Sequence, residues 1–127
     1  DVRINIHPLP PCQGDPQWLE IAWNHLIANA IKFTQPRTVA TLEIGAGMLE
    51  KTPFYFVRDN GIGFDMKYVD KIFGVFQRLH IEDEFEGTGM GLALTSRIIE
   101  QHGGRIWANA SVNQGATFFF TLNESET

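Results

Sequence analysis

The most regular pattern in the sequence is a helical repeat of apolar residues. Between Trp18 and Phe33 the apolar positions recur at steps of three and four, and they are Leu19, Ala22, Trp23, Leu26, Ala30 and Phe33. That spacing places them on one face of an amphipathic helix, and Asp15 and Pro16 suit its start. Such a face must pack against a larger structure, and a chain of 127 residues with 43% hydrophobic content can supply it as one domain.

Five other segments have the composition or the alternation of strands. Three lie before a second helical segment, and they are Val2 to His7, Val39 to Gly45 and Phe54 to Arg58. Two follow it, Arg105 to Ala110 and Ala116 to Leu122, on either side of a Gln114-Gly115 turn. The first alternates apolar and polar residues, which predicts a half-buried strand. The next two predict a hairpin joined through Gly47 to Lys51, and the last two predict another hairpin.

A second helix is predicted over Gly89 to His102, where Gly103 and Gly104 form a natural stop. Before it, Asp59 to Glu86 is rich in glycine and acidic residues, with one short helical piece around Tyr68 to Phe73, and a loop of that length is usually functional. The order strand, helix, hairpin, loop, helix, hairpin predicts an α+β fold. We expect a two-layer α/β sandwich, in which a mixed sheet carries helices on one face.

Composition excludes several classes of function. The formal net charge is -5 and the ten basic residues are scattered, so the chain lacks the dense positive surface that binds nucleic acid. Cys12 is the single cysteine, which favours a reducing, cytoplasmic setting without disulfides. No apolar run approaches about 20 residues, so we expect no direct membrane contact. Asp1 opens the sequence without a start methionine, which suggests a fragment of a longer parent, soluble or membrane-anchored.

Three polar residues form a line on the first predicted helix. His25, Asn29 and Lys32 stand at steps of four and three, at the edge of the apolar face. An asparagine carbonyl can coordinate Mg²⁺, which takes its other ligands from water and substrate phosphates, and a lysine supplies a point charge. The alternative is an ordinary solvated helix edge.

A carboxylate followed by glycines ends the third predicted strand. In Asp59-Asn60-Gly61-Ile62-Gly63 the aspartate stands at a strand end, beside glycines that permit tight or positive-φ backbone. Its carboxylate could accept a hydrogen bond from the exocyclic amine of adenine. The alternative is a simple turn, because Asp-Asn-Gly is common turn chemistry.

A glycine-rich segment, Gly87-Thr88-Gly89-Met90-Gly91-Leu92, opens the second predicted helix. Exposed backbone N–H groups at a helix start attract a phosphate, although this segment is neither a P-loop nor a dinucleotide-binding fingerprint. Upstream, Phe73 and Phe76 could anchor a lid over a ligand, and the planar fork of Arg78 could reach a terminal phosphate.

In this order, the motifs resemble those of the histidine kinase catalytic domain, within the superfamily that includes DNA gyrase, Hsp90 and MutL ATPases. Leu26 to Thr34 resembles the N box, Asp59 to Phe64 the G1 box, Ile72 to Phe76 the F box and Gly87 to Leu92 the G2 box. The segments Phe76 to His80 and Gly103 to Trp107 are similar to phytochrome-type and related hybrid sensor kinases. The resemblance implies the Bergerat ATP-binding fold across nearly the whole chain, residues 1–127.

The resemblance also implies the site residues and their ligands, ATP and Mg²⁺. Asn29 would coordinate Mg²⁺, Lys32 and Arg78 would contact phosphates, and Asp59 would bind the adenine amine. The implied nucleotide-binding set is Asn29, Lys32, Phe33, Asp59, Gly61, Gly63, Phe73, Phe76, Arg78, Gly87, Thr88, Gly89, Met90, Gly91 and Leu92.

His25 departs from the family pattern, because histidine kinases usually carry Asn at this position and the hydrolysing relatives carry Glu. The Glu of those relatives is the general base for water, so its absence favours transfer of the phosphoryl group to another nucleophile. His25 itself either acts indirectly at the metal site or is a tolerated substitution.

None of the four histidines has the sequence context of a phosphoacceptor, so we expect the acceptor on a separate dimerisation domain. The resemblance implies further partners, namely a downstream response regulator and a second copy of the parent in a homodimer. The isolated domain should bind ATP with little turnover. Two alternatives remain, an ATPase clamp and a regulatory module whose catalysis has lapsed.

Overall fold

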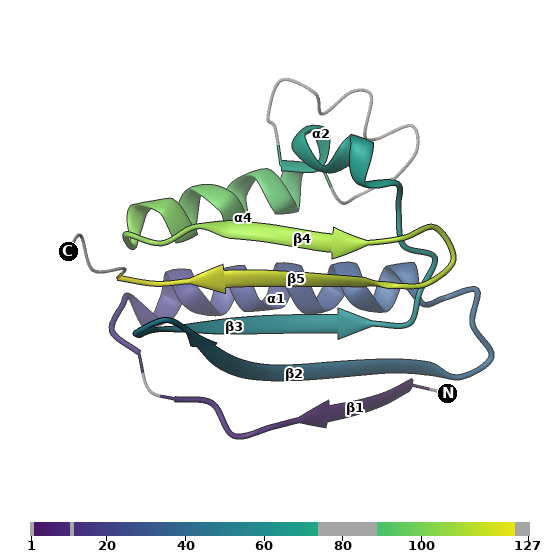
Figure 1. The fold of residues 1–127 in the computed structure, drawn as a ribbon, viewed down its shortest axis with the longest axis horizontal. Coiled ribbons are helices and arrows are strands. Elements are labelled where there is room, and N and C mark those ends of the chain that lie inside the picture. The colour runs from purple at the N-terminus through teal and green to yellow at the C-terminus, as the bar shows by residue number, and fades with distance from the viewer. Residues whose placement is uncertain (1, 11, 74–88, 124–127) are drawn as a thin grey trace.

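The computed structural model describes residues 2–10, 12–73 and 89–123 of the chain. In chain order the described elements are β1 (Val2–Ile6), α1 (Pro16–Phe33), β2 (Ala40–Leu49), β3 (Thr52–Asp59), the 3-10 turn η1 (Met66–Tyr68), α2 (Val69–Phe73), α4 (Gly89–Gln101), β4 (Ile106–Ala110) and β5 (Ala116–Thr121). The strands form a five-stranded sheet in the order β1-β2-β3-β5-β4, and α1 and α4 lie behind it (Figure 1).

The sheet is mixed, as the sequence predicts. β1 runs parallel to β2, whereas the pairs β2–β3, β3–β5 and β4–β5 are antiparallel. The described helices cover one face of it, which confirms the expected α+β two-layer sandwich. In the described ranges no helix has the length and apolar character of a bilayer span.

The first helix begins where its capping residues predict. Asp15 Oδ1 accepts hydrogen bonds from the N–H groups of Gln17 and Trp18, at 2.9 and 3.3 Å, and Pro16 occupies the first turn, where no intrahelical donor is needed. At the other end the Thr34 hydroxyl donates to the carbonyl of Ile31 at 2.8 Å. These caps satisfy backbone groups that a helix end would otherwise leave unpaired.

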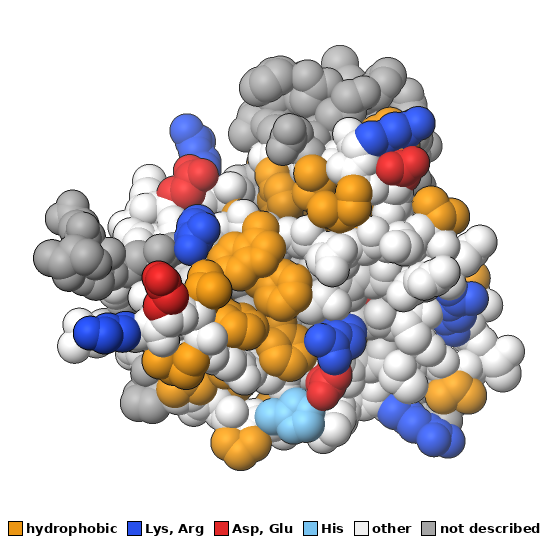
Figure 2. All heavy atoms as spheres, viewed as in Figure 1, with side chains coloured by type: hydrophobic (Ala, Val, Ile, Leu, Met, Phe, Trp, Pro, Cys, Tyr) orange, Lys and Arg blue, Asp and Glu red, His pale blue; other side chains and the backbone are white. Residues whose placement is uncertain are grey.

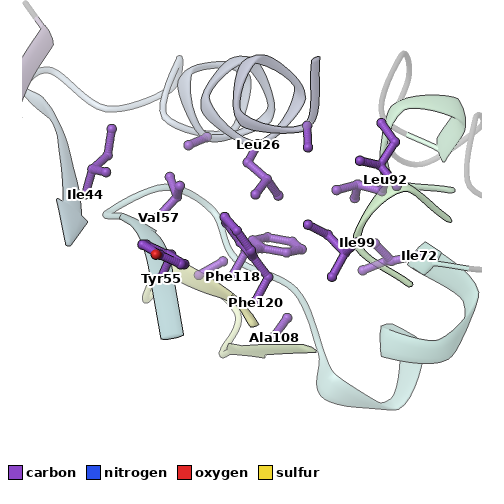
Figure 3. Packing of buried hydrophobic residues seen from close by; sticks show 14 of the residues in the cluster. Leu26, Ile44, Tyr55, Val57, Ile72, Leu92, Ile99, Ala108, Phe118 and Phe120 are labelled. Carbon is purple, nitrogen blue, oxygen red and sulfur yellow. The ribbon is translucent and has the colours of Figure 1, made fainter. Parts of the chain in front are cut away.

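The core lies between the helices and the inner face of the sheet. Leu26 of α1 points toward Phe118 and Phe120 of β5, while Ile99 of α4 approaches them from the other side (Figure 3). The Trp23 ring packs edge-on against Phe120, with a centroid distance of 5.0 Å. This packing fixes α1 against the centre of the sheet, so it also fixes the polar line that α1 carries.

Two details of the sequence prediction are wrong. The first strand is not half-buried, because α1 and α4 lie over the other strands and leave β1 exposed along its whole length, with Ile6 63% exposed. The first hairpin is longer than expected, since β2 runs through Gly47 to Leu49 and the turn is confined to Glu50 and Lys51.

Aromatic side chains explain why the longer hairpin tolerates glycine. The Phe56 and Phe54 rings lie across Gly45 and Gly47, where an added Cβ would stand 2.7 and 2.6 Å from the ring tips. On the same face, which none of the described helices covers, the Trp107 and Phe119 rings stack at 5.4 Å. Figure 2 shows hydrophobic side chains gathered on this face. The rings therefore shield one another and the glycine backbone from water.

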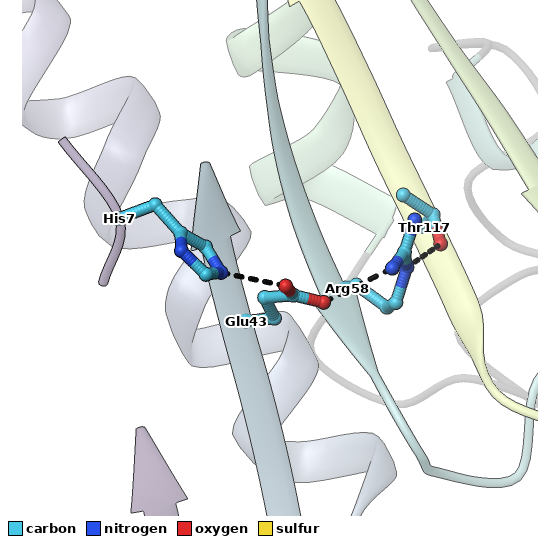
Figure 4. A network of polar contacts seen from close by, with 4 residues as sticks. All are labelled: His7, Glu43, Arg58 and Thr117. Atoms are coloured by element: carbon cyan, nitrogen blue, oxygen red, sulfur yellow. Dashed lines mark hydrogen bonds and ion pairs between the residues drawn. The ribbon is translucent and has the colours of Figure 1, made fainter. Parts of the chain in front are cut away.

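Beside these rings, polar contacts tie four residues of the open face together (Figure 4). Glu43 of β2 contacts His7 Nε2 at 2.6 Å and accepts from Arg58 of β3 at 3.0 Å, while Arg58 Nε donates to Thr117 of β5 at 3.4 Å. The hydrogen bond with His7, followed by the charge of Arg58, lowers the pKa of the half-buried Glu43 carboxyl. The contacts link three strands and the residue that follows β1.

Candidate functional site

The carboxylate of Asp59 lies at the end of β3 and is 5% exposed. Its Oδ1 accepts a hydrogen bond from the N–H of Gly61 at 2.8 Å, and among the described residues its buried Oδ2 has no partner. Burial raises the pKa of Asp59 to about 6, although backbone N–H groups of Gly61 and Ala116 oppose the shift. The sequence placed Asp59 just after the strand, whereas it is the last strand residue.

The glycines after Asp59 are needed because backbone packs against them. A Cβ on Gly61 would collide with the carbonyl oxygen of Phe33, and a Cβ on Gly63 would collide with that of Ser111. Gly63 also has a positive φ of 62°, which L side chains rarely adopt. Both glycines therefore allow the loop to lie close to the end of α1 and to the β4–β5 turn.

Arg37 holds this loop in place. Its Nε donates to the carbonyl of Asn60 at 2.7 Å, and its Nη2 donates to the carbonyls of Gly61 and Asn113, each at 2.8 Å. No local pattern in the sequence marks Arg37 as a site residue, because one of its partners, Asn113, lies 76 residues away in the chain. Arg37 thus joins the loop that follows Asp59 to the β4–β5 turn.

Asn60 fixes the loop from the strand side. Its side-chain Oδ1 accepts from the N–H of Thr41 at 2.9 Å, and its Nδ2 donates to the carbonyl of Val39 at 3.0 Å. The Asn60 side chain is therefore hydrogen-bonded to β2 and to the residue before it, so the Asp-Asn-Gly sequence is more than a solvent-exposed turn. The result is a carboxylate whose backbone surroundings are held before any ligand arrives.

Asn29 is the buried member of the polar line on α1. It is 6% exposed, and neither its Nδ2 nor its Oδ1 has a hydrogen-bond partner among the described residues. His25 and Lys32, one turn to either side, are half-buried. The alternative of a solvated helix edge therefore does not fit Asn29, because a buried amide without partners costs about 1–3 kcal/mol.

One backbone contact brings the two halves of the site together. The carbonyl of Phe33, one turn after Asn29 on α1, accepts from the N–H of Ile62 at 3.1 Å. The loop that follows Asp59 is therefore attached to the helix that carries Asn29. Phe33 is only 4% exposed, and it contributes to the site through its carbonyl, which accepts this hydrogen bond.

The other predicted residues fall into three groups. Phe73 ends α2 and its ring packs edge-on against Phe118, at 5.9 Å, and Leu92 is buried in the core (Figure 3). Gly89 begins α4, and the helix continues through Met90 and Gly91. The remaining residues of the prediction lie outside the described residues, and they are Phe76, Arg78, Gly87 and Thr88.

The site joins a buried carboxylate and a buried amide, each with side-chain atoms that the described protein leaves without partners. A carboxylate oxygen can accept a hydrogen bond from an amine, and an amide oxygen suits a hard cation such as Mg²⁺. The residues present therefore fit a nucleotide with a metal ion on its phosphates. Buried polar atoms without partners lower the stability of a fold, and they are typical of ligand sites.

Comparison with solved structures defines the class of fold. The full-length structure of ShkA in complex with AMPPNP matches with a TM-score of 0.77 at 26% sequence identity, covering 95% of this chain and 25% of that one. The fold is the α+β Bergerat-like fold of histidine kinase catalytic domains.

Sequence comparison gives the family. The model described as "Histidine kinase-, DNA gyrase B-, and HSP90-like ATPase" matches residues 14–126, and the chain belongs to this family. Cyanobacterial phytochrome A of Nostoc sp. is 49% identical over 120 residues, and Phytochrome-like protein Cph1 of Synechocystis sp. is 40% identical over 120 residues. Each match covers 94% of this chain and 16% of the relative, so the chain spans about a sixth of their length. The resemblance to phytochrome-type sensor kinases is confirmed.

Proposed function

We propose that this domain binds Mg-ATP and transfers the γ-phosphoryl group to a histidine on a separate dimerisation domain, in two-component signalling. The observation that carries the proposal is the pair of buried polar groups with unpaired atoms, Asp59 and Asn29, which belong to a loop and a helix that are bonded to each other. Membership of the family and a structural relative solved with the ATP analogue AMPPNP support the nucleotide class.

Each residue has a distinct part in the proposed mechanism. Asp59 Oδ2 accepts from the exocyclic amine of adenine, and Arg37 and Asn60 hold the backbone that orients it. Asn29 Oδ1 would hold the metal ion, while Lys32 and Arg78 would neutralise phosphate charge. Mg²⁺ on the phosphates would supply further charge neutralisation, and catalysis consists mainly of positioning.

His25 separates the proposed kinase from the ATPase clamp. Histidine stands where the hydrolysing relatives carry the glutamate that activates water, so this chain has no carboxylate at that position. We expect the isolated domain to bind ATP with little turnover, and to act on the dimerisation domain of its own parent. A homodimeric parent and a downstream response regulator complete the proposed pathway.

Calorimetric titration with Mg-ATP tests the nucleotide site. Asp59→Asn should abolish measurable binding, because an amide nitrogen at Oδ2 would face the adenine amine donor to donor. Asp65→Asn, an exposed carboxylate six residues further along, is the matched control and should bind like the original chain. Absence of binding by the original chain would support the lapsed regulatory module.

A second assay tests the reaction. With radiolabelled ATP, addition of the parent's dimerisation domain should transfer label to a histidine of that domain. Rapid release of free phosphate by the isolated chain, lost in His25→Ala, would instead support the clamp.

A further inference from the structure

A polar contact joins the two helices behind the sheet. His25 Nδ1 of α1 lies 3.3 Å from Thr95 Oγ1 of α4, in a region where α1 and α4 pack together. Thr95 is 0% exposed and His25 is half-buried. Either group can donate in this contact, since the tautomer of His25 decides the two roles.

The surroundings of this contact are apolar. Ala22, one turn before His25, and Leu26, the residue after it, are buried on α1, and Leu92 and Ile99 are buried on α4, one turn to either side of Thr95. Apolar contacts are non-directional, so they tolerate small shifts of one helix along another. A hydrogen bond has a narrow range of distance and angle, so it selects one alignment of the two helices.

That alignment matters for the proposed site because of what each helix carries. His25 stands one turn before Asn29, the proposed metal ligand, and Thr95 stands in the second turn of the helix that begins at Gly89. The contact therefore lies one turn from the amide proposed to face the metal ion, and on the helix whose start is proposed to face the phosphates.

We infer that Thr95 is a positioning residue, whose hydroxyl holds His25 and thereby aligns Asn29 with the start of α4. The inference rests on the proposed function, since it assigns Thr95 a part in binding the metal and phosphates of Mg-ATP. Thr95 touches neither ligand in this scheme. Its effect passes through His25 and the α1 backbone to Asn29.

The first test is spectroscopic and needs no nucleotide. Long-range ¹H–¹⁵N correlation spectra of the ¹⁵N-labelled chain report the environment of His25 Nδ1, whichever of the two groups donates the hydrogen. Thr95→Val, which has the same shape without the hydroxyl, should shift the Nδ1 resonance of His25, and Thr95→Ser should restore it. An Nδ1 resonance that stayed unchanged in a folded Thr95→Val variant would overturn the inference.

The second test separates the metal and phosphate part of the site from the adenine part. Thr95→Val should weaken Mg-ATP binding about fivefold, the effect of losing one hydrogen bond, and leave adenosine binding unchanged. Thr95→Ser should bind Mg-ATP like the original chain. Equal losses for both ligands, or no loss for either, would contradict a positioning role.

The outcomes also distinguish this inference from the proposed function. If the original chain bound neither Mg-ATP nor adenosine, the proposed function would fall, while a shift of the His25 Nδ1 resonance in Thr95→Val would still establish the contact. If the chain bound Mg-ATP and Thr95→Val bound it equally well, the proposed function would stand without the inference. Thermal unfolding of each variant shows whether a loss of affinity reflects a loss of fold.

Discussion

Replacement of Asp59 by asparagine should change the pH dependence of folding in a defined direction. Burial raises the pKa of Asp59 from 3.8 to about 6 in the folded chain. Between these values the folded state keeps the proton that the unfolded state has lost, so stability falls as the pH rises through this window. Well above pH 6 the folded state carries the full free-energy cost of burying the ionised Asp59 carboxylate.

The size of the effect follows from the same shift. Each pKa unit corresponds to about 1.4 kcal/mol, so the rise to about 6 corresponds to about 3 kcal/mol. Asp59→Asn removes the titration but places an amide nitrogen at a buried position without an acceptor, a pH-independent cost of about 1–3 kcal/mol. The variant should therefore gain about 2 kcal/mol relative to the original chain between pH 4 and pH 7, because the unfolded chain is already partly ionised at pH 4.

Urea unfolding at pH 4, 5, 6 and 7 measures this difference directly. Other groups, including Glu43, titrate equally in both proteins, so they cancel in the comparison. Asp65→Asn is the control for removing a carboxylate from an exposed position of the same loop. A difference between Asp59→Asn and the original chain that stayed constant across the range would refute the argument, because Asp59 would then be ionised in the folded state throughout.

Three further results are expected. Adenosine, which has no phosphates to titrate, should bind more weakly as the pH falls below about 6, since protonated Asp59 loses its charge and part of its acceptor capacity; calorimetry at pH 5 and pH 8 measures this. Arg37→Ala, which removes three hydrogen bonds to carbonyl groups, should cost about 3 kcal/mol in urea unfolding and weaken adenosine binding, and Arg37→Lys should recover part of each. Leu26→Ala should cost about 3 kcal/mol by thermal or urea unfolding, whereas Leu94→Ala, at a position 39% exposed, should cost under about 1 kcal/mol.

The sequence predicts those features that neighbouring residues determine. The cap at Asp15, the apolar face of α1 and the stop after α4 all depend on residues within one or two turns. The position of Asp59 at a strand end is local in the same sense, because an extended segment and a glycine-rich turn adjoin it. These features needed no knowledge of the partners across the sheet.

Features that depend on distant residues were not predictable in this way. Arg37 contacts Asn113, and His25 contacts Thr95 across 70 residues, so neither pair has a sequence spacing to recognise. The exposure of β1 is likewise a tertiary property, because the alternation in the strand is real but the helices cover other strands. The alternation reports which side chains share a face and not whether that face is covered.

The position of β1 has a mechanical consequence. As an edge strand it is attached to β2 alone, and its exposed side chains add little apolar burial to those backbone hydrogen bonds. A tensile load applied through β1 would meet its weakest resistance there, while the antiparallel strands β2, β3, β5 and β4 remained clamped by the core. The segment that holds Asp59 in place would thus keep its shape under a pull that detached the first strand.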